Sequence, residues 1–156
     1  MKRTIERMEV FEVEMPLVGT FTSAGISKQV TKCVVVRLTA SDGTVGISSA
    51  EASSSAKSPH TAAELVVALR ERVAPALIGQ DPFNIHRLME LFDSLAPTQP
   101  GAGAAAEMAC VDLAARIYGV PMHTYLGGAV APHVEFNGWI GALPPKEATA
   151  EATRWL

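Results

Sequence analysis

Two apolar runs joined by Asp42-Gly43 constrain the fold of this chain more than any other sequence feature. The first run, Val30 to Thr39, is rich in β-branched residues and nearly continuous, as in a strand that is covered on both faces. The second run, Thr44 to Glu51, follows directly. Asp-Gly between two such runs favours a hairpin, because both positions tolerate the positive φ that a tight turn requires. The sequence therefore predicts two antiparallel strands here.

A third strand is predicted upstream, where apolar and acidic residues alternate from Val10 until Pro16 ends the pattern. The three strands would form an antiparallel meander. Two stretches beside them, Leu17 to Gln29 and Ala52 to His60, are rich in Gly, Ser and Thr and are longer than a hairpin needs. We interpret both as loops, for which binding and plain exposed surface are equally compatible readings.

Helical patterns follow the strands. Thr61 and Glu64 have the spacing of a capping box, and Pro75 is expected to end or kink this first helix. Asp81-Pro82 predicts an N-cap and first turn for a second helix, with an apolar stripe at Ile85, Leu88, Met89, Phe92 and Leu95. A third helix is predicted at 104–118, with small or apolar residues around most of its circumference. Strands followed by helices indicate an α+β fold.

The bulk properties exclude several classes of protein. The chain has 156 residues, 48% of them hydrophobic, and a formal net charge of -3, which is typical of a globular domain. Lys and Arg are scattered, so no nucleic-acid surface is predicted. No apolar run reaches the roughly 18 residues of a membrane helix, and the acidic N-terminal region does not resemble a secretory signal. We expect a cytoplasmic protein in which Cys33 and Cys110 are buried free thiols.

Two motifs resemble catalytic or binding signatures but lack the necessary context. Gly101 to Ala106 matches GxGxxA, yet the preceding residues contain two prolines and cannot form the strand that a dinucleotide-binding turn must follow. These glycines more simply allow a loop to enter a crowded helix N-terminus. Ser48 lies in a near match to the GxSxG elbow, but the last glycine and the following helix are missing. A small hydrolase built on Ser48 is therefore a weak hypothesis.

The charged residues also favour structural roles. Asp112 and Arg116 are four positions apart on the third helix, the spacing of a surface ion pair. Lys57 is alone in a serine-rich loop, where a solvated charge is the simpler interpretation. The four histidines form no metal-binding pair of the HxH or HExxH type. Residue chemistry alone thus nominates no active site.

A longer stretch, Ala105 to Gly128, resembles the junction helix of the enolase superfamily, in particular of the mandelate racemase and muconate lactonizing enzyme group. Gly119-Val120-Pro121 and Leu126-Gly127-Gly128 stand where that group has its Gly-Val-Pro and Leu-Gly-Gly. The opening strand, the Asp42-Gly43 hairpin and the run Leu77 to Pro82 are similar to the group's capping domain in order and spacing. Where the family continues with Trp-Gly-Glu, this chain has Ile47-Ser48-Ser49-Ala50-Glu51.

The resemblance implies a two-part enzyme. Residues 1–132 would be an α+β capping domain of the enolase N-terminal type, and residues 133–156 the first βα unit of a truncated (β/α)8 barrel. In that unit, a strand at Val134 to Ile140 would precede a helix opened by Pro144-Pro145. The parent reaction would be Mg²⁺-dependent proton abstraction α to a carboxylate, by a racemase, cycloisomerase or dehydratase acting on a small carboxylate. We expect neither catalytic residues nor metal ligands in this chain.

In this family the cap supplies loops that close over the barrel mouth and select the substrate. By position, the substrate-capping residues of this chain would be Thr20, Phe21, Thr22, Ser23, Gly25, Ser53, Ser54 and Ser55. The isolated chain should be inactive, whereas its parent would be an isomerase or lyase. The rival interpretation is a stand-alone α+β binding or dimerisation module without catalysis. Neither interpretation involves nucleic acid or membrane, and both leave a homo-oligomer open.

Overall fold

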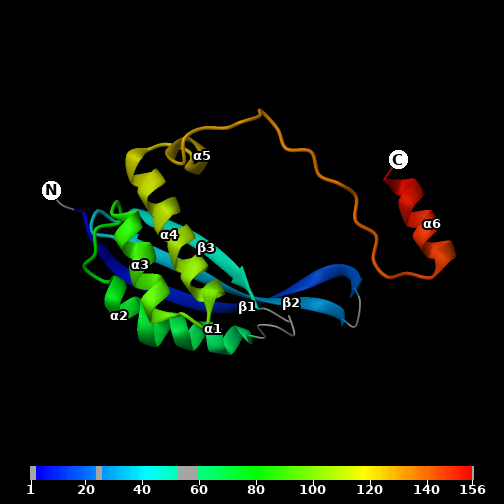
Figure 1. Cartoon of the computed structure of the whole chain (residues 1–156), viewed down its shortest axis with the longest axis horizontal. Coiled ribbons are helices and arrows are strands. Elements are labelled where there is room, and N and C mark those ends of the chain that lie inside the picture. Colours follow the sequence, from blue (N-terminus) through cyan, green and yellow to red (C-terminus); the bar gives the residue numbers. More distant parts are fainter. Residues whose placement is uncertain (1–2, 24–25, 53–59, 156) are drawn as a thin grey trace. The chain divides into compact units, whose positions relative to one another are not determined.

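The computed structural model describes residues 3–23, 26–52 and 60–155, which form an α+β fold (Figure 1). Its elements, in chain order, are β1 (Ile5–Ser23), β2 (Ile26–Ala40), β3 (Val45–Glu51), α1 (Ala62–Ala68), the π-helical turn η1 (Leu69–Val73), α2 (Ala74–Leu77), α3 (Ile85–Leu95), α4 (Pro100–Tyr118), α5 (Met122–Tyr125) and α6 (Pro145–Arg154). The chain divides into two compact units. The first comprises Met1–Val13 and Lys32–Ala129, and the second comprises Glu14–Thr31 and Val130–Leu156.

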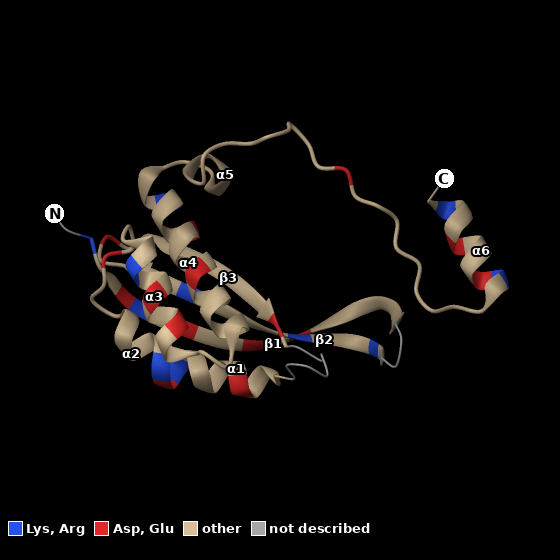
Figure 2. Cartoon of the chain, in the orientation of Figure 1, with Lys and Arg blue, Asp and Glu red and all other residues tan. Residues whose placement is uncertain are grey.

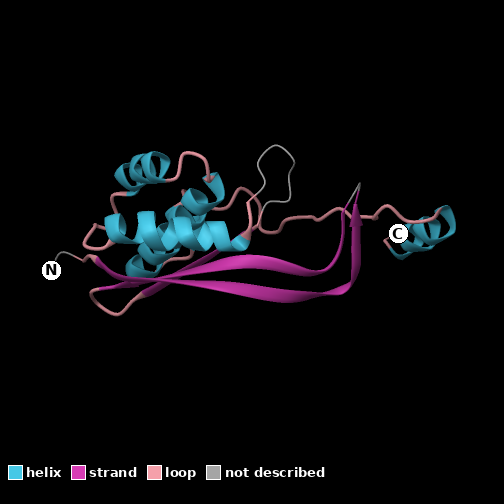
Figure 3. Ribbon diagram, turned by 90° about the horizontal axis from the view of Figure 1, so that it is seen from below, coloured by secondary structure: helices cyan, strands magenta, loops and turns pink. Residues whose placement is uncertain are grey.

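The strands form one antiparallel sheet in the order β1-β2-β3, which confirms the predicted meander. In the β2–β3 pair, Val36 lies opposite Ser48 and Arg37 opposite Ile47. In the first unit the helices lie on one face of the sheet, as Figure 3 shows. β2 sends Val34, Val36 and Leu38, every second residue, into the core beneath them.

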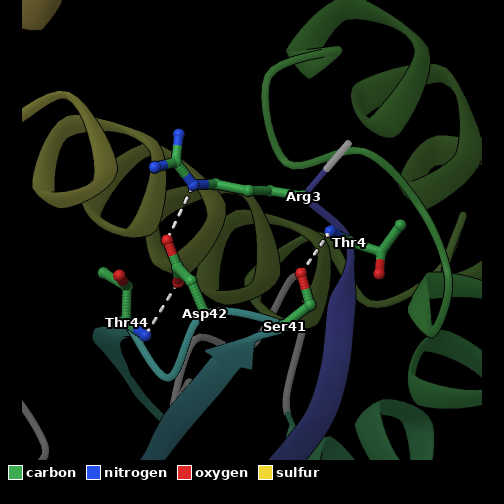
Figure 4. A network of polar contacts seen from close by, with 5 residues as sticks. All are labelled: Arg3, Thr4, Ser41, Asp42 and Thr44. Carbon is green, nitrogen blue, oxygen red and sulfur yellow. Dashed lines mark hydrogen bonds and ion pairs between the residues drawn. The ribbon is translucent and has the colours of Figure 1, made fainter. Parts of the chain in front are cut away.

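The predicted turn between β2 and β3 is present, but only Gly43 and not Asp42 has a positive φ. Gly43 has a φ of +84°, and its amide donates to the Ala40 carbonyl at 2.9 Å. Asp42 Oδ1 accepts from the Thr44 amide at 3.0 Å, while Arg3 Nε lies 2.7 Å from Asp42 Oδ2 (Figure 4). The Thr44 hydrogen bond, followed by the Arg3 guanidinium, holds the pKa of Asp42 below its ordinary value. The turn is thus tied to the N-terminal end of β1.

The strands β1 and β2 are longer than the sequence predicts. β1 continues through Pro16 to Ser23, and β2 begins at Ile26, so most of the predicted loop at 17–29 is strand. Pro16 is tolerated because β1 lies at the edge of the sheet, where a residue without an N–H group breaks no central ladder. The polar composition of this stretch was misleading because backbone pairing between two strands does not require apolar side chains on both faces.

The first helical region begins as predicted. Thr61 Oγ1 accepts from the Glu64 amide at 3.2 Å, and Glu64 Oε2 accepts from the Thr61 amide at 2.7 Å, which completes the capping box. The helix does not end at Pro75 but continues to Leu77. The widened π turn η1 ends at Val73, two residues before Pro75, and such a turn relieves the i→i−4 pattern that a proline ring would obstruct.

The second helix begins later than predicted. α3 starts at Ile85 with Asn84 as its N-cap, and not at Asp81. Asp81 Oδ1 instead accepts from the Phe83 amide at 2.9 Å, so this carboxylate closes a separate turn before the helix. The predicted apolar stripe is present in part. Leu88 and Phe92 are buried in the core, whereas Met89 is 39% exposed.

α4 is the central helix of the first unit. It starts at Pro100 and not at 104, so the glycines of the GxGxxA match lie in its first turns. Figure 2 shows that few charged residues interrupt α4, and nine of its residues are buried. α4 packs on β3 at Gly46, where an added Cβ would lie 2.5 Å from the Ala109 carbonyl oxygen and 2.6 Å from Leu113 Cβ. This strand and this helix therefore touch without a side chain between them at Gly46.

In the second unit, the helix predicted after Pro144-Pro145 is present as α6. The strand predicted at Val134–Ile140 is not, because no strand is assigned to these residues. A strand forms only by backbone pairing with another strand, and in the described part of the chain the sheet contains β1, β2 and β3 alone. Its large apolar side chains stay exposed, Phe136 at 91% and Val134 at 75%.

Candidate functional site

The far end of the β1–β2 hairpin contacts the segment 139–143 within the second unit. The ring of Phe21 stacks on the indole of Trp139, with centroids 4.7 Å apart and planes 3° from parallel. A parallel stack at this distance is a favourable arrangement for two aromatic rings. Phe21 is one of the predicted substrate-capping residues, so the contact brings a predicted site residue onto the stretch that precedes α6.

A backbone contact accompanies the stack. The Ala142 amide donates to the Thr22 carbonyl at 3.1 Å. A Cβ added to Gly141 would lie 2.8 Å from the same carbonyl oxygen and 3.4 Å from the Trp139 ring. The approach of the two segments therefore depends on the absence of a side chain at Gly141. Thr22 can accept this bond because β1 is an edge strand with outward backbone groups.

Side chains on β2 connect the hairpin end internally. Gln29 Nε2 donates to Thr20 Oγ1 at 3.1 Å, and Lys28 Nζ donates to Thr31 Oγ1 at 3.0 Å. Lys28 Nζ also lies 5.4 Å from the centroid of the Phe21 ring, within the range of a cation–π interaction. Thr20 and Phe21 are thus both held by β2.

An open hollow of about 420 Å³ adjoins the stack. Arg154 Nη1 lies 3.1 Å from Glu151 Oε2 in the wall of the hollow, so its cation and anion neutralise each other locally. Apart from Thr20, the rest of the lining residues are apolar. The lining residues are Leu17, Val18, Gly19, Thr20, Phe21, Trp139, Leu143, Glu151 and Arg154. This composition suits a small ligand that has both polar and apolar parts.

None of the other predicted capping residues has a described side chain at this site. Ser23 is the last residue of β1, and its side chain is not described. Gly25, Ser53, Ser54 and Ser55 lie outside the described residues, as does Lys57. Trp139 and Gly141 are the site residues that sequence reasoning missed. The one sequence signal for these two residues is that a tryptophan and a glycine lie close together at the end of a predicted strand.

Ser48 has a structural role. Its hydroxyl donates to the Ala105 carbonyl at 2.5 Å and so joins β3 to α4. The proton needed for this bond is not available for activation by a base, and the residue lies within β3 and not at a strand-to-helix elbow. The hydrolase hypothesis is therefore not supported.

The pair Asp112 and Arg116 is the structural ion pair that the spacing predicts, with 2.8 Å between Nε and Oδ2. Asp112 Oδ2 also accepts from the Ile47 amide at 2.8 Å. The GxGxxA glycines lie in the first turns of the same helix, and packing does not require them. An added Cβ would be 3.7 Å from Leu65 at Gly101 and 3.6 Å from Phe92 at Gly103, which are ordinary contacts.

The residues present do not fit a Mg²⁺ ion. Among residues 3–23, 26–52 and 60–155, no three His, Cys, Asp or Glu side chains come together as a metal would require. Cys33 and Cys110 are both buried and free, as predicted. Burial, with the Glu107 carboxylate adding to it, raises the pKa of Cys110 to about 12, which keeps this thiol protonated. We derive no catalytic step from this chain.

Residues 5–127 match the family described as mandelate racemase / muconate lactonizing enzyme, N-terminal domain. The chain belongs to this family. A cis-3-hydroxy-L-proline dehydratase of Roseibium aggregatum is 34% identical over 144 residues, which are 91% of this chain and 39% of the dehydratase. Membership confirms the resemblance inferred from the Gly-Val-Pro and Leu-Gly-Gly motifs.

Solved structures agree with this assignment. A dipeptide epimerase of Methylococcus capsulatus, solved with Mg and the dipeptide L-Arg-D-Lys, matches with a TM-score of 0.86 and 27% identity over 97% of this chain and 42% of its own. The N-succinyl Arg/Lys racemase of Bacillus cereus shares the fold, with a TM-score of 0.90 and 23% identity over 99% of this chain and 41% of its own. The chain spans about two fifths of the length of the curated family members it matches.

No helix in the described part of the chain is both long enough and apolar enough to cross a membrane.

Proposed function

We propose that this chain is the substrate-capping part of a mandelate racemase / muconate lactonizing-type enzyme. The observation that carries the proposal is the contact between the hairpin end, with Thr20, Phe21 and Thr22, and the segment 139–142. In this proposal residues 1–132 form the cap and residues 133–156 the first βα unit of a barrel. The division is supported by the family match, which ends at residue 127, and by the helix α6 beyond it.

The parent reaction that we propose is Mg²⁺-dependent abstraction of a proton α to a carboxylate, as a racemase, cycloisomerase or dehydratase. Because the described residues offer no Mg²⁺ site, the metal ligands and the acid–base groups would have to come from other residues. The role of this chain is to surround a substrate and not to transform it. The isolated chain is expected to be inactive.

The substrate class that we propose is a small amino-acid-derived carboxylate. Two similar proteins carry such compounds in their names or crystals, cis-3-hydroxy-L-proline in one and the dipeptide L-Arg-D-Lys in the other. The hollow beside Phe21 has the mixed polar and apolar lining that such a molecule requires.

The test compares the chain alone with the product of its full reading frame. Both are incubated with Mg²⁺ and a panel of hydroxyprolines, dipeptides, N-succinyl amino acids and muconate, and deuterium exchange at the α-carbon is followed by NMR. We expect exchange with the full product and none with residues 1–156. Turnover by the chain alone would contradict the proposal. A reading frame that stops at Leu156 and yields a monodisperse, inactive protein would favour the stand-alone module.

A further inference from the structure

The site contains two residues that no motif assigns, Trp139 and Gly141, and both face the hairpin end. Trp139 offers its indole face to Phe21, and Gly141 leaves the space in which the Thr22 carbonyl lies. The Ala142 amide then completes the contact through its bond to that carbonyl. The aromatic stack is made to Phe21, and both the close approach and the hydrogen bond are made to Thr22, the next residue of β1.

Each of these three contacts fixes a different aspect of the position of the hairpin end. The parallel stack fixes the plane of the Phe21 ring, and Lys28 is near the same ring. The hydrogen bond to Thr22 fixes the position of the strand along its own axis, because a shift by one residue would turn the carbonyl away. Gly141 sets the separation of the two segments, since any side chain there would meet the carbonyl oxygen.

We infer that Trp139 and Gly141 are positioning residues, which hold Thr20–Thr22 in one place beside the hollow that the substrate would occupy. The inference rests on the proposed function, because it assigns a role within the capping segment. Phe21 then acts as the anchor of that segment. Val18, Gly19 and Leu143, which line the hollow beside this anchor, are the groups left to determine specificity.

The experiment follows amide hydrogen exchange at Ala142 by NMR in the chain as it stands. Its N–H group is protected only while it is bonded to Thr22, so exchange reports the docked fraction directly. The Leu143 amide, which donates to Gly141 at 2.9 Å within its own segment, is the internal reference. The variants Phe21→Leu and Trp139→Ala should speed exchange at Ala142 about 2- to 10-fold relative to Leu143, the range that an aromatic stack spans.

Two further variants separate positioning from general stability. Trp139→Phe keeps an aromatic face, so the Ala142 amide should be protected more than in Trp139→Ala and nearly as well as in the unchanged chain. Gly141→Ala should remove this protection although Phe21 and Trp139 are both unchanged. Matched controls exist for both kinds of change. Phe136 is 91% exposed, and Gly138 approaches Trp155 and not the hairpin, so Phe136→Leu and Gly138→Ala should leave Ala142 protected.

Unchanged exchange at Ala142 in Phe21→Leu and Gly141→Ala would overturn the inference. So would equal acceleration in the two controls, or acceleration shared by amides of α4, because either would mean general unfolding. The readout needs no substrate and no metal. It therefore gives its answer even if the enzyme proves to have a different activity, and failure of the proposed function is distinguishable from failure of this inference.

Discussion

Asp112 accepts a hydrogen bond from the backbone amide of Ile47, 2.8 Å away on β3, with the same oxygen that pairs with Arg116. The carboxylate therefore links the central helix to the outer strand, and the ion pair is only one of its interactions. Helix and strand meet again one residue along, where Ser48 donates to Ala105. The α4–β3 interface thus combines these two hydrogen bonds with the close packing at Gly46.

Replacement of Asp112 should cost more stability than replacement of its ionic partner. Asp112→Ala removes a charge-assisted bond to the backbone, which contributes about 1–2 kcal/mol. Arg116→Ala removes only an exposed i,i+4 pair, which contributes about 0.5 kcal/mol or less. Urea unfolding of the two variants measures the difference. Equal losses would mean that the ion pair, and not the strand contact, is the important interaction.

The same substitution should have opposite effects at two glycines. Gly46→Ala places a methyl group 2.5 Å from the Ala109 carbonyl oxygen, and such overpacking should destabilise the fold by about 1–3 kcal/mol. Gly103→Ala adds a methyl group at an ordinary 3.6 Å from Phe92 and removes a flexible helical residue, which should stabilise by about 0.5–1 kcal/mol. Thermal melts of both variants test the contrast. A stabilised Gly46→Ala would refute the close contact between β3 and α4.

Acid should weaken the first helix through Glu64. The Thr61 hydrogen bonds lower the pKa of Glu64 from its ordinary 4.5 in the folded state. A carboxyl whose pKa is depressed by folding stabilises the fold above its unfolded pKa, and this contribution is lost as pH falls through the folded value. Glu64→Gln, which can still accept from the Thr61 amide, should therefore lose less stability below pH 4.5 than the unchanged chain does.

Urea midpoints measured at neutral and acidic pH provide the readout for Glu64. Thr61→Ala should also reduce the acid dependence, because it removes the hydroxyl that holds the carboxylate. An acid dependence that Glu64→Gln leaves unchanged would show that the capping box contributes nothing to it.

Cys110 should be inert toward thiol reagents while the chain is folded. Its pKa is raised to about 12 by burial, so the reactive thiolate is scarce at neutral pH, and the side chain is also inaccessible. In a Cys33→Ala background, labelling by a disulfide reagent should be at least about 100-fold slower in buffer than in urea. Rapid labelling of the native chain would mean that α4 opens frequently from the core.

Local signals in the sequence were reliable guides to structure. The capping box of Thr61 and Glu64 and the Asp42-Gly43 turn both depend on neighbours a few positions apart, and both are present. The pair Asp112 and Arg116 belongs to the same class. Each is formed by residues that approach one another whenever the local element forms, so spacing alone is sufficient to predict it.

Features set by tertiary position were not predictable in this way. Pro16 ends a strand by local rules, but its place on an edge strand allows β1 to continue. Phe21 and Trp139 are far apart in the chain, and nothing near either residue indicates the other. The bond from Ile47 to Asp112 requires the rotation of α4 about its axis, which the helical pattern does not specify. The capping stretch that contains Phe21 was thus visible from its position in the chain, whereas its contact partner Trp139 was not.

The contact at Gly46 restricts how this family member can vary in length. One residue inserted into α4 between Ala105 and Ala109 would turn the remainder of the helix by about 100°. Ala109 and Leu113 would then no longer present the backbone and Cβ that lie against Gly46. Insertions and deletions should therefore be better tolerated in the α3–α4 connection than in α4 before Leu113, so a glycine on a neighbouring strand restricts the length of this part of the helix.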